Sequence, residues 1–410
     1  MCHPHRAWAV CGGGAVMLFT VMGLGSNVFS VFQPYIIQVN HFTNAQGSWI
    51  ITVRSLFITL GMMTAGWVCG KIGLRRTASF SLALVALSCF LFGQAASFPV
   101  YCTAGALAGI GYSWGGMIPL SLLIKNWFQD RQAFALALAS AGSGLATIVA
   151  PAPLTWLIER HGLAAAFWWE GGLILLLALL VFLLVRDRPE QLGLIPYQIG
   201  GGPAAHAPEA LPPQGLTKTG WGLVLLAVFL IGGPTGVAIS HVGVLYSTAG
   251  FPSGTVAAIV SCSGLFLIAG KLIYGQLVDH LGGRISNYLL YGVSLLSYLL
   301  FCLANVGGSP AAFAAAIFFG LSMPISNVAL SVWSRDLRGD AGFAQGLKWS
   351  QTVYALGILL LGPVPGMLAD ATGSYVPAYF LFFLMMLLSA LLMCGVYWQT
   401  KAGGKPAARE

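Results

Sequence analysis

The sequence predicts an all-α membrane protein whose twelve transmembrane helices form two six-helix halves. Three observations lead to this fold class: 57% of the 410 residues are hydrophobic, only 7% are charged, and the mean hydropathy is +0.83. A soluble globular protein carries roughly 25% charged residues, so these charges are too few to cover a surface that faces water. The composition therefore excludes an ordinary soluble enzyme and a disordered chain.

The net charge of +8 does not indicate a nucleic-acid partner, because the 19 Lys and Arg residues are too scattered to follow a phosphate backbone. The eight cysteines lie singly, nearly all in apolar runs, without a CxxC pair or a Cys/His cluster of zinc-ligand spacing. We therefore expect no disulfide framework, no metal site and no cofactor. The sequence also shows no catalytic set such as a Ser/His/Asp group, so an enzyme is not expected.

Twelve apolar runs are long enough to be transmembrane helices, which need about 20 residues to cross the hydrocarbon core. The first run is too long for a cleavable signal peptide, and no small-residue cleavage site follows it. The predicted spans are 10–38, 46–70, 76–96, 98–125, 133–158, 163–185, 220–248, 253–279, 286–305, 309–333, 342–369 and 375–398.

Glycines and prolines modify these helices. Gly105 and Gly109 belong to a glycine-rich fourth span, where small residues favour the close approach of a neighbouring helix. Candidate bends in the helices are Pro119, Pro151, Pro234, Pro324 and Pro363.

A polar, Gly- and Pro-rich segment divides the chain into two halves. Residues 186–219 are predicted to form a cytoplasmic interdomain loop between an N-terminal six-helix bundle, 1–185, and a C-terminal one, 220–398. Residues 399–410 form a cytoplasmic tail. Fifteen of the 19 Lys and Arg residues fall on the side of the N-terminus, and only Arg160 falls on the other side. By the positive-inside rule, both termini are cytoplasmic in a multi-pass protein of the cell inner membrane.

A loop motif is repeated after the second and the eighth span, with the pattern G-x-x-x-[D/G]-x-x-G-x-R. Its glycines permit a tight turn between closely packed helices, and its acidic residue can cap a helix or pair across the loop. The repeated positions are Gly66, Gly73 and Arg75 in the first copy, and Gly275, Asp279, Gly282 and Arg284 in the second.

Twelve spans with this loop at matched positions resemble the major facilitator superfamily. The first copy departs from the superfamily motif, because Gly70 stands where an acidic residue is usual. The resemblance implies a monomeric transporter in the lipid bilayer, whose two halves rock about a central site and expose it alternately to each side.

Two shorter segments narrow the resemblance. The run from Lys125 through Trp127 and Phe128 to Gly144, and the segment from Arg186 to Pro196, are similar to segments of the oxalate/formate antiporter and monocarboxylate transporter families. The aspartate-glycine signature of monocarboxylate transporters is absent from the first span. The resemblance implies a small carboxylate substrate, with a proton or a counter-anion as the coupling partner.

Cations inside the spans are the strongest pointers to a substrate site, because an ionised side chain near the bilayer centre costs from about 3 to more than 10 kcal/mol. Lys271 stands where the related families bind the substrate carboxylate with an arginine; the alternative is a lysine that snorkels to the inner interface. Arg54 can hold a carboxylate with two hydrogen bonds. Its alternative role is a structural tie to a neighbouring helix.

The eleventh span favours a monocarboxylate over oxalate. Oxalate exchangers carry a second cation in this span, but Lys348 lies one to two turns nearer the cytoplasm, and Tyr354 or Ala355 stands at the matching depth. We therefore expect Lys348 to snorkel rather than to complete a dicarboxylate clamp.

The remaining polar residues give weaker pointers. His241 can gain and lose a proton near neutral pH and so take part in coupling, or it can contact substrate. The third alternative is a structural histidine that only forms a hydrogen bond within its helix. Glu170 is interpreted as structural. Leu267 occupies the place where proton-coupled relatives have a carboxylate. The lack of a carboxylate there favours exchange or facilitated movement over proton symport. Further candidate substrate contacts are Gln33, Tyr112, Asn327 and Tyr354.

Two other functions remain open on the same fold. One is an efflux pump for amphipathic compounds, which the many aromatic residues would suit, although cations inside the spans disfavour cationic drugs. The other is a ligand sensor that does not transport.

Overall fold

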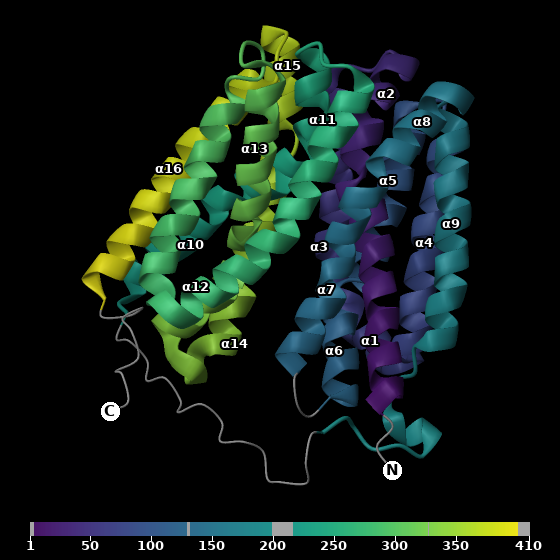
Figure 1. The fold of residues 1–410 in the computed structure, drawn as a ribbon, viewed down its shortest axis with the longest axis vertical. Helices are drawn as coiled ribbons and strands as arrows, with labels where there is room; N and C mark the ends of the chain where they lie inside the picture. Colours follow the sequence, from purple (N-terminus) through teal and green to yellow (C-terminus); the bar gives the residue numbers. More distant parts are fainter. Residues whose placement is uncertain (1–3, 129–131, 199–215, 327, 401–410) are drawn as a thin grey trace. The chain divides into compact units, whose positions relative to one another are not determined.

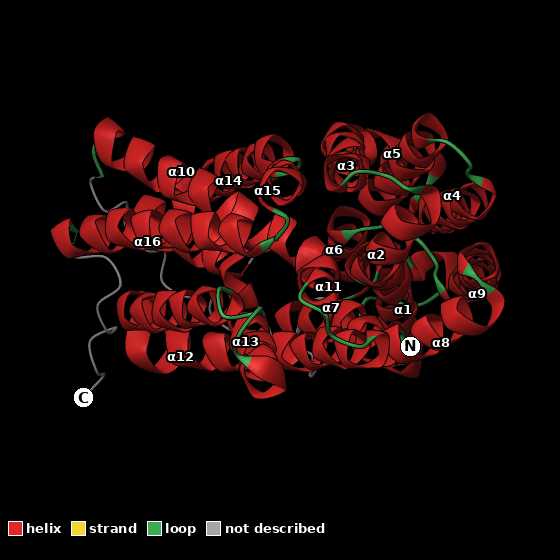
Figure 2. Ribbon diagram, turned by 90° about the horizontal axis from the view of Figure 1, so that it is seen from above, coloured by secondary structure: helices red, strands yellow, loops and turns green. Residues whose placement is uncertain are grey.

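The computed structural model describes residues 4–128, 132–198, 216–326 and 328–400 (Figure 1). The chain divides into two compact units, Met1–Ala205 and His206–Glu410. In the described part of the chain, the regular structure is helical apart from an isolated parallel bridge between Phe128 and Tyr197 (Figure 2).

The first unit contains the helices that the apolar runs predict, several of them in two pieces. Its elements are α1 (Pro4–Leu18), the π-helix η1 (Phe19–Asn27), α2 (Phe29–Asn40), α3 (Asn44–Ile72), α4 (Leu74–Gln94), α5 (Phe98–Trp114), α6 (Met117–Trp127), α7 (Gln132–Val149), α8 (Pro151–His161), α9 (Leu163–Leu184) and the 3₁₀ helix η2 (Pro189–Leu192).

The second unit begins with α10 and ends with α16. Its elements are α10 (Lys218–Gly232), the π-helix η3 (Gly233–Val237), α11 (Ala238–Thr248), α12 (Ser253–Phe301), α13 (Gly308–Ser322), the 3₁₀ helix η4 (Met323–Ser326), α14 (Val328–Leu361), α15 (Val364–Thr372) and α16 (Val376–Gln399). Both α12 and α14 contain a sharp turn at a glycine with positive φ, Gly282 (78°) and Gly339 (66°).

Ten helices of the described chain are long and apolar enough to cross a membrane, and the bent pair Leu138–Val149 and Pro151–His161 makes an eleventh if it is one span. All ten match predicted spans, from Arg6–Asn40 (predicted 10–38) to Val376–Gln399 (predicted 375–398). The predicted span 286–305 corresponds to the part of α12 that follows Gly282.

Glycines set the closest helix contacts within each unit. A β-carbon at Gly105 of α5 would lie 3.1 Å from the carbonyl oxygen of Ile50, and one at Gly109 would collide with the carbonyl oxygen of Arg54. In the second unit, a β-carbon at Gly232 of α10 would lie 2.8 Å from the backbone of Gly357 in α14. The glycines of the fourth span therefore bring α5 against α3, directly behind the buried Arg54.

Prolines accompany most of the helix breaks. α8 begins at Pro151, η3 contains Pro234, η4 contains Pro324, and Pro363 separates α14 from α15. The fourth span differs, because it breaks at Gly115 and Gly116 and Pro119 lies inside the first turn of α6.

Candidate functional site

The two repeated loops turn at equivalent glycines. Gly73 has φ 86° and Gly282 has φ 78°, values that residues with a β-carbon rarely adopt. In contrast, a β-carbon at Gly66 or Gly275 would meet no atom within 4 Å. The side chain of Asp279 lies outside the described part of the structure.

Asp187 holds the first loop in place of the missing motif acid. Its Oδ1 accepts a hydrogen bond of 2.6 Å from the backbone nitrogen of Arg75, in the first turn of α4. The Arg75 guanidinium donates to the Phe182 carbonyl oxygen (2.7 Å) and lies 3.7 Å from the centre of the Phe182 ring. A carboxylate at a helix N-terminus satisfies a free N–H group and interacts favourably with the helix dipole.

The two segments that carry the narrower resemblance contact each other. The Asn126 side-chain amide donates to the Asp187 carbonyl oxygen (3.0 Å), and the Trp127 indole donates to that of Arg186 (2.7 Å). The backbone nitrogen of Tyr197 then donates to the Trp127 carbonyl oxygen (2.7 Å). Residues 186–197 therefore tie together the ends of α4, α6 and α9. Sequence reasoning missed this role of Asp187.

We expect Asp187→Ala to lower the free energy of unfolding of the protein by about 0.5–2 kcal/mol, the usual effect of removing a capping side chain. Thermal unfolding in detergent should show a lower midpoint. Glu190→Ala is the matched control, because Glu190 is an exposed acid of the same segment. Equal midpoints for the two variants would contradict the capping role.

Arg54 is buried inside the first unit, with 4% of its surface exposed. Its Nη1 donates to the carbonyl oxygen of Gly25 in η1 (3.4 Å), and its guanidinium lies 4.9 Å from the centre of the Phe29 ring. Tyr112 of α5 is near enough to interact with it electrostatically. The contact with Gly25 is a structural tie of the kind expected as the alternative role.

Gln33 lies next to this region, on α2 and one turn beyond Phe29. Only 1% of its surface is exposed, and neither its Oε1 nor its Nε2 has a hydrogen-bond partner among the described residues. A β-carbon at Gly47 of α3 would lie 3.5 Å from Nε2. The amide is thus enclosed between α2 and α3 without its bonds being satisfied.

Lys271 lies on α12 of the second unit and is half-buried. None of the described residues makes a hydrogen bond or an ion pair with it. A β-carbon at the preceding Gly270 would lie 2.7 Å from the Leu321 carbonyl oxygen, so α12 and α13 are in close contact beside the lysine. Figure 1 shows these two helices running side by side.

Tyr354 belongs to a polar group around the π-helix η3. Its hydroxyl is 2.9 Å from Oγ1 of Thr235, which in turn donates to the Ile231 carbonyl oxygen (2.7 Å). The Tyr298 hydroxyl donates to the Pro234 carbonyl oxygen. Sequence reasoning missed Thr235 and Tyr298. Each unit thus has a π-helical segment, η1 or η3, whose carbonyl groups accept bonds from polar side chains of other helices.

The other predicted candidates are in different surroundings. His241 is fully buried, its Nδ1 lies 2.9 Å from the Val237 carbonyl oxygen, and its ring centre is 6.0 Å from that of Tyr375. Glu170 is 5% exposed and accepts a weak bond of 3.7 Å from the Cys89 thiol. Lys348 is exposed. Asn327 lies outside the described residues.

We expect His241→Gln to flatten the pH dependence of transport between about pH 5.5 and 7.5, where histidine side chains ordinarily change charge, while exchange survives. Glutamine can keep a hydrogen bond to the Val237 carbonyl group. Counterflow measured across this pH range in proteoliposomes tests the prediction. Loss of exchange at every pH would instead show that His241 binds substrate or is required for the structure.

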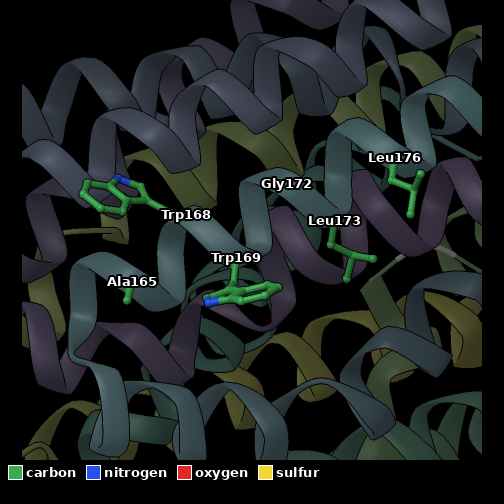
Figure 3. A pocket seen from close by; sticks show the side chains of 6 residues that line it. All are labelled: Ala165, Trp168, Trp169, Gly172, Leu173 and Leu176. Atoms are coloured by element: carbon green, nitrogen blue, oxygen red, sulfur yellow. The ribbon is translucent and has the colours of Figure 1, made fainter.

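A shallow hollow of about 470 Å³ lies on α9. Its lining is apolar and comes entirely from that helix: Ala165, Trp168, Trp169, Gly172, Leu173 and Leu176 (Figure 3). None of the predicted site residues lines it, so it is not the candidate site.

The described residues contain no group of three or more His, Cys, Asp or Glu side chains that could hold a metal ion. What they do provide for an anion is a cation within an apolar helix of each unit, Arg54 in the first and Lys271 in the second. Such groups can bind an anion reversibly, because cationic donors form strong hydrogen bonds with carboxylates.

Several known proteins are similar to this chain. Monocarboxylate transporter 13 of Bos taurus is 26% identical over 364 residues, covering 86% of this chain and 80% of its own length. Monocarboxylate transporter 12 of Rattus norvegicus is 23% identical, covering 89% and 79%. The aspyridones efflux protein apdF of Emericella nidulans is 21% identical, covering 95% and 77%.

Solved structures show the same fold at low sequence identity. A D-xylose-proton symporter matches with a TM-score of 0.71 and 14% identity, over 94% of this chain and 96% of its own. The nucleoside transporter NupG matches with a TM-score of 0.74 and 12% identity, over 95% and 100%. The family model of the Major Facilitator Superfamily matches residues 15–348. With this match over most of its length, the chain belongs to the Major Facilitator Superfamily and is a membrane transporter homologous to the monocarboxylate transporters.

Proposed function

We propose that this transporter carries small organic anions, with monocarboxylates favoured, by alternating access. The observation that carries the proposal is the pair of cations placed in apolar helices, Arg54 in α3 and Lys271 in α12. A cation costs several kcal/mol in such a position unless a partner or water compensates it, and a substrate carboxylate is a suitable partner. The names of two similar relatives, both monocarboxylate transporters, support the same substrate class.

The transport mode we propose is exchange or facilitated movement. We favour this mode over proton symport for two reasons. The carboxyl group of Glu170 is enclosed in the first unit, next to Cys89. Leu267 stands where proton-coupled relatives have a carboxylate. We further propose twelve spans with both termini in the cytoplasm of an inner membrane, and a monomeric transporter.

Uptake into proteoliposomes tests the proposed function. Labelled lactate, formate and oxalate are supplied outside, with and without preloaded anion inside. Saturable uptake of a carboxylate that preloading accelerates supports an exchanger, and uptake without preloading supports facilitated movement. If none of the three anions enters faster than into protein-free vesicles, the proposed function is wrong.

Efflux of amphipathic compounds is the second candidate, because one similar relative is named as an efflux protein. Accumulation of an amphipathic fluorescent dye in cells, with and without the expressed transporter, separates the two. Reduced dye accumulation together with no carboxylate uptake would favour efflux. A ligand sensor would show carboxylate binding without either kind of transport.

A further inference from the structure

Two guanidinium groups meet at the C-terminal end of α9. Nε of Arg75 donates to the Phe182 carbonyl oxygen over 2.7 Å, and Nη1 of Arg186 lies 3.2 Å from the same oxygen. Nη1 of Arg186 is also 3.4 and 3.1 Å from the carbonyl oxygens of Leu183 and Val185. Cations often bind the last carbonyl groups of a helix, but a helix end carries only about half a negative charge. Two cations are more than this end can compensate.

The excess positive charge at this end of α9 is available to an anion. Among the described residues, neither guanidinium makes another hydrogen bond or an ion pair. Asp187 follows Arg186, but its Oδ1 accepts the hydrogen bond from the backbone nitrogen of Arg75. Arg76 is exposed and adds a third positive charge, close enough to repel that of Arg75. Because each guanidinium has five N–H donors, both side chains keep donors for a ligand.

The helix that carries this cationic end presents an apolar face. Leu176, Leu179 and Leu183 are 64%, 56% and 55% exposed, and their spacing of three and four residues places them on one face of α9. Leu176 also lines the hollow on α9 (Figure 3). The helix is long and apolar enough to cross a membrane. Its leucine face therefore suits acyl chains, and its cationic end lies where the polar headgroups begin.

We propose that Arg75 and Arg186 bind the phosphate of an anionic phospholipid whose acyl chains lie along the leucine face of α9. Such a lipid matches both features of this surface, because guanidinium groups form strong, directional hydrogen bonds with phosphate oxygens and acyl chains cover exposed leucines. A soluble phosphate would use only the cations. A zwitterionic lipid would bring its own positive group towards Arg76, so the site selects an anionic headgroup such as that of phosphatidylglycerol.

Lipid binding to the purified full-length protein in a neutral detergent tests the proposal. Native mass spectrometry measures the affinities for phosphatidylglycerol and phosphatidylcholine with identical acyl chains. We expect the wild type to bind phosphatidylglycerol about tenfold more tightly or better, since a hydrogen bond to a charged group typically contributes this factor. Arg75→Gln and Arg186→Gln should each remove most of this preference. Equal binding of the two lipids by the wild type would overturn the proposal.

Arg188→Gln is the matched control for charge. Arg188 is an exposed arginine of the same segment, and its loss lowers the net charge by the same amount as that of Arg186. We expect it to keep the wild-type preference for phosphatidylglycerol. If Arg188→Gln loses as much of the preference as Arg186→Gln does, the attraction is a general one to a positive surface and the assigned pair is wrong.

A competition measurement on the wild type tests the lipid as the occupant and does not require the variants to fold. Inorganic phosphate offers the same oxygens without acyl chains, so we expect it to leave bound phosphatidylglycerol in place at equal concentration. Displacement of the lipid by phosphate would show a site for a free anion and would overturn the proposal. Neither measurement uses transport, so both results are independent of the proposed substrate.

Discussion

Lys271→Gln is expected to reduce carboxylate uptake by about 30-fold or more while the protein still folds and inserts. Removing one partner of a charged hydrogen-bonded pair costs about 2–5 kcal/mol, and each 1.4 kcal/mol is a factor of ten in affinity. Glutamine keeps nearly the length and polarity of lysine and removes only the charge. Because none of the described residues pairs with Lys271, the loss would be that of the substrate contact.

The comparison that tests this prediction uses initial rates of lactate uptake, normalised to the amount of protein reconstituted. Lys348→Gln is the matched control, since Lys348 is an exposed lysine of the same unit and its charge should not matter. Lys271→Arg should keep partial activity. If Lys271→Gln transports lactate with wild-type affinity, the carboxylate is bound elsewhere and the lysine snorkels to the interface.

The sequence predicts the helices well because a single physical requirement governs them. A span needs about 20 apolar residues, and the observed candidate spans agree with runs chosen on that basis alone. The helix breaks are less predictable. Pro119 looked like a bend, yet the fourth span breaks before it at Gly115 and Gly116, and the proline lies in the first turn of α6, where its missing N–H group is not needed.

The site could be predicted only in part, and the reason lies in tertiary contacts. Arg54 and Lys271 stand out in the sequence because charge is rare in apolar runs. The surroundings of these cations do not stand out in the sequence. For example, Arg54 donates to a carbonyl group of the π-helix η1, and π-helical turns have no simple sequence pattern. The contact between Asp187 and Arg75 joins residues 112 positions apart, which no local pattern can show.

Lactate-sized monocarboxylates are expected to bind more tightly than oxalate, by roughly tenfold to hundredfold. An oxalate ion held by Lys271 has a second carboxylate, and we expect Tyr354 or Ala355 at the matching depth of the eleventh span. Neither residue is a cation, and the Tyr354 hydroxyl is engaged with Thr235. A polar group left without a partner costs about 1–3 kcal/mol, and a charged one costs more, which gives this ratio at 1.4 kcal/mol per decade.

Inhibition constants of oxalate and lactate against the same labelled substrate test the expected order. Tyr354→Lys supplies a second cation at this depth and should raise the affinity for oxalate relative to lactate. Thr352→Lys adds the same charge at an exposed position of the same helix and should leave the ratio unchanged. Oxalate binding ten times more tightly than lactate to the wild type would contradict the prediction and would nominate Arg54, the other cation of the proposed function, as the partner of the second carboxylate.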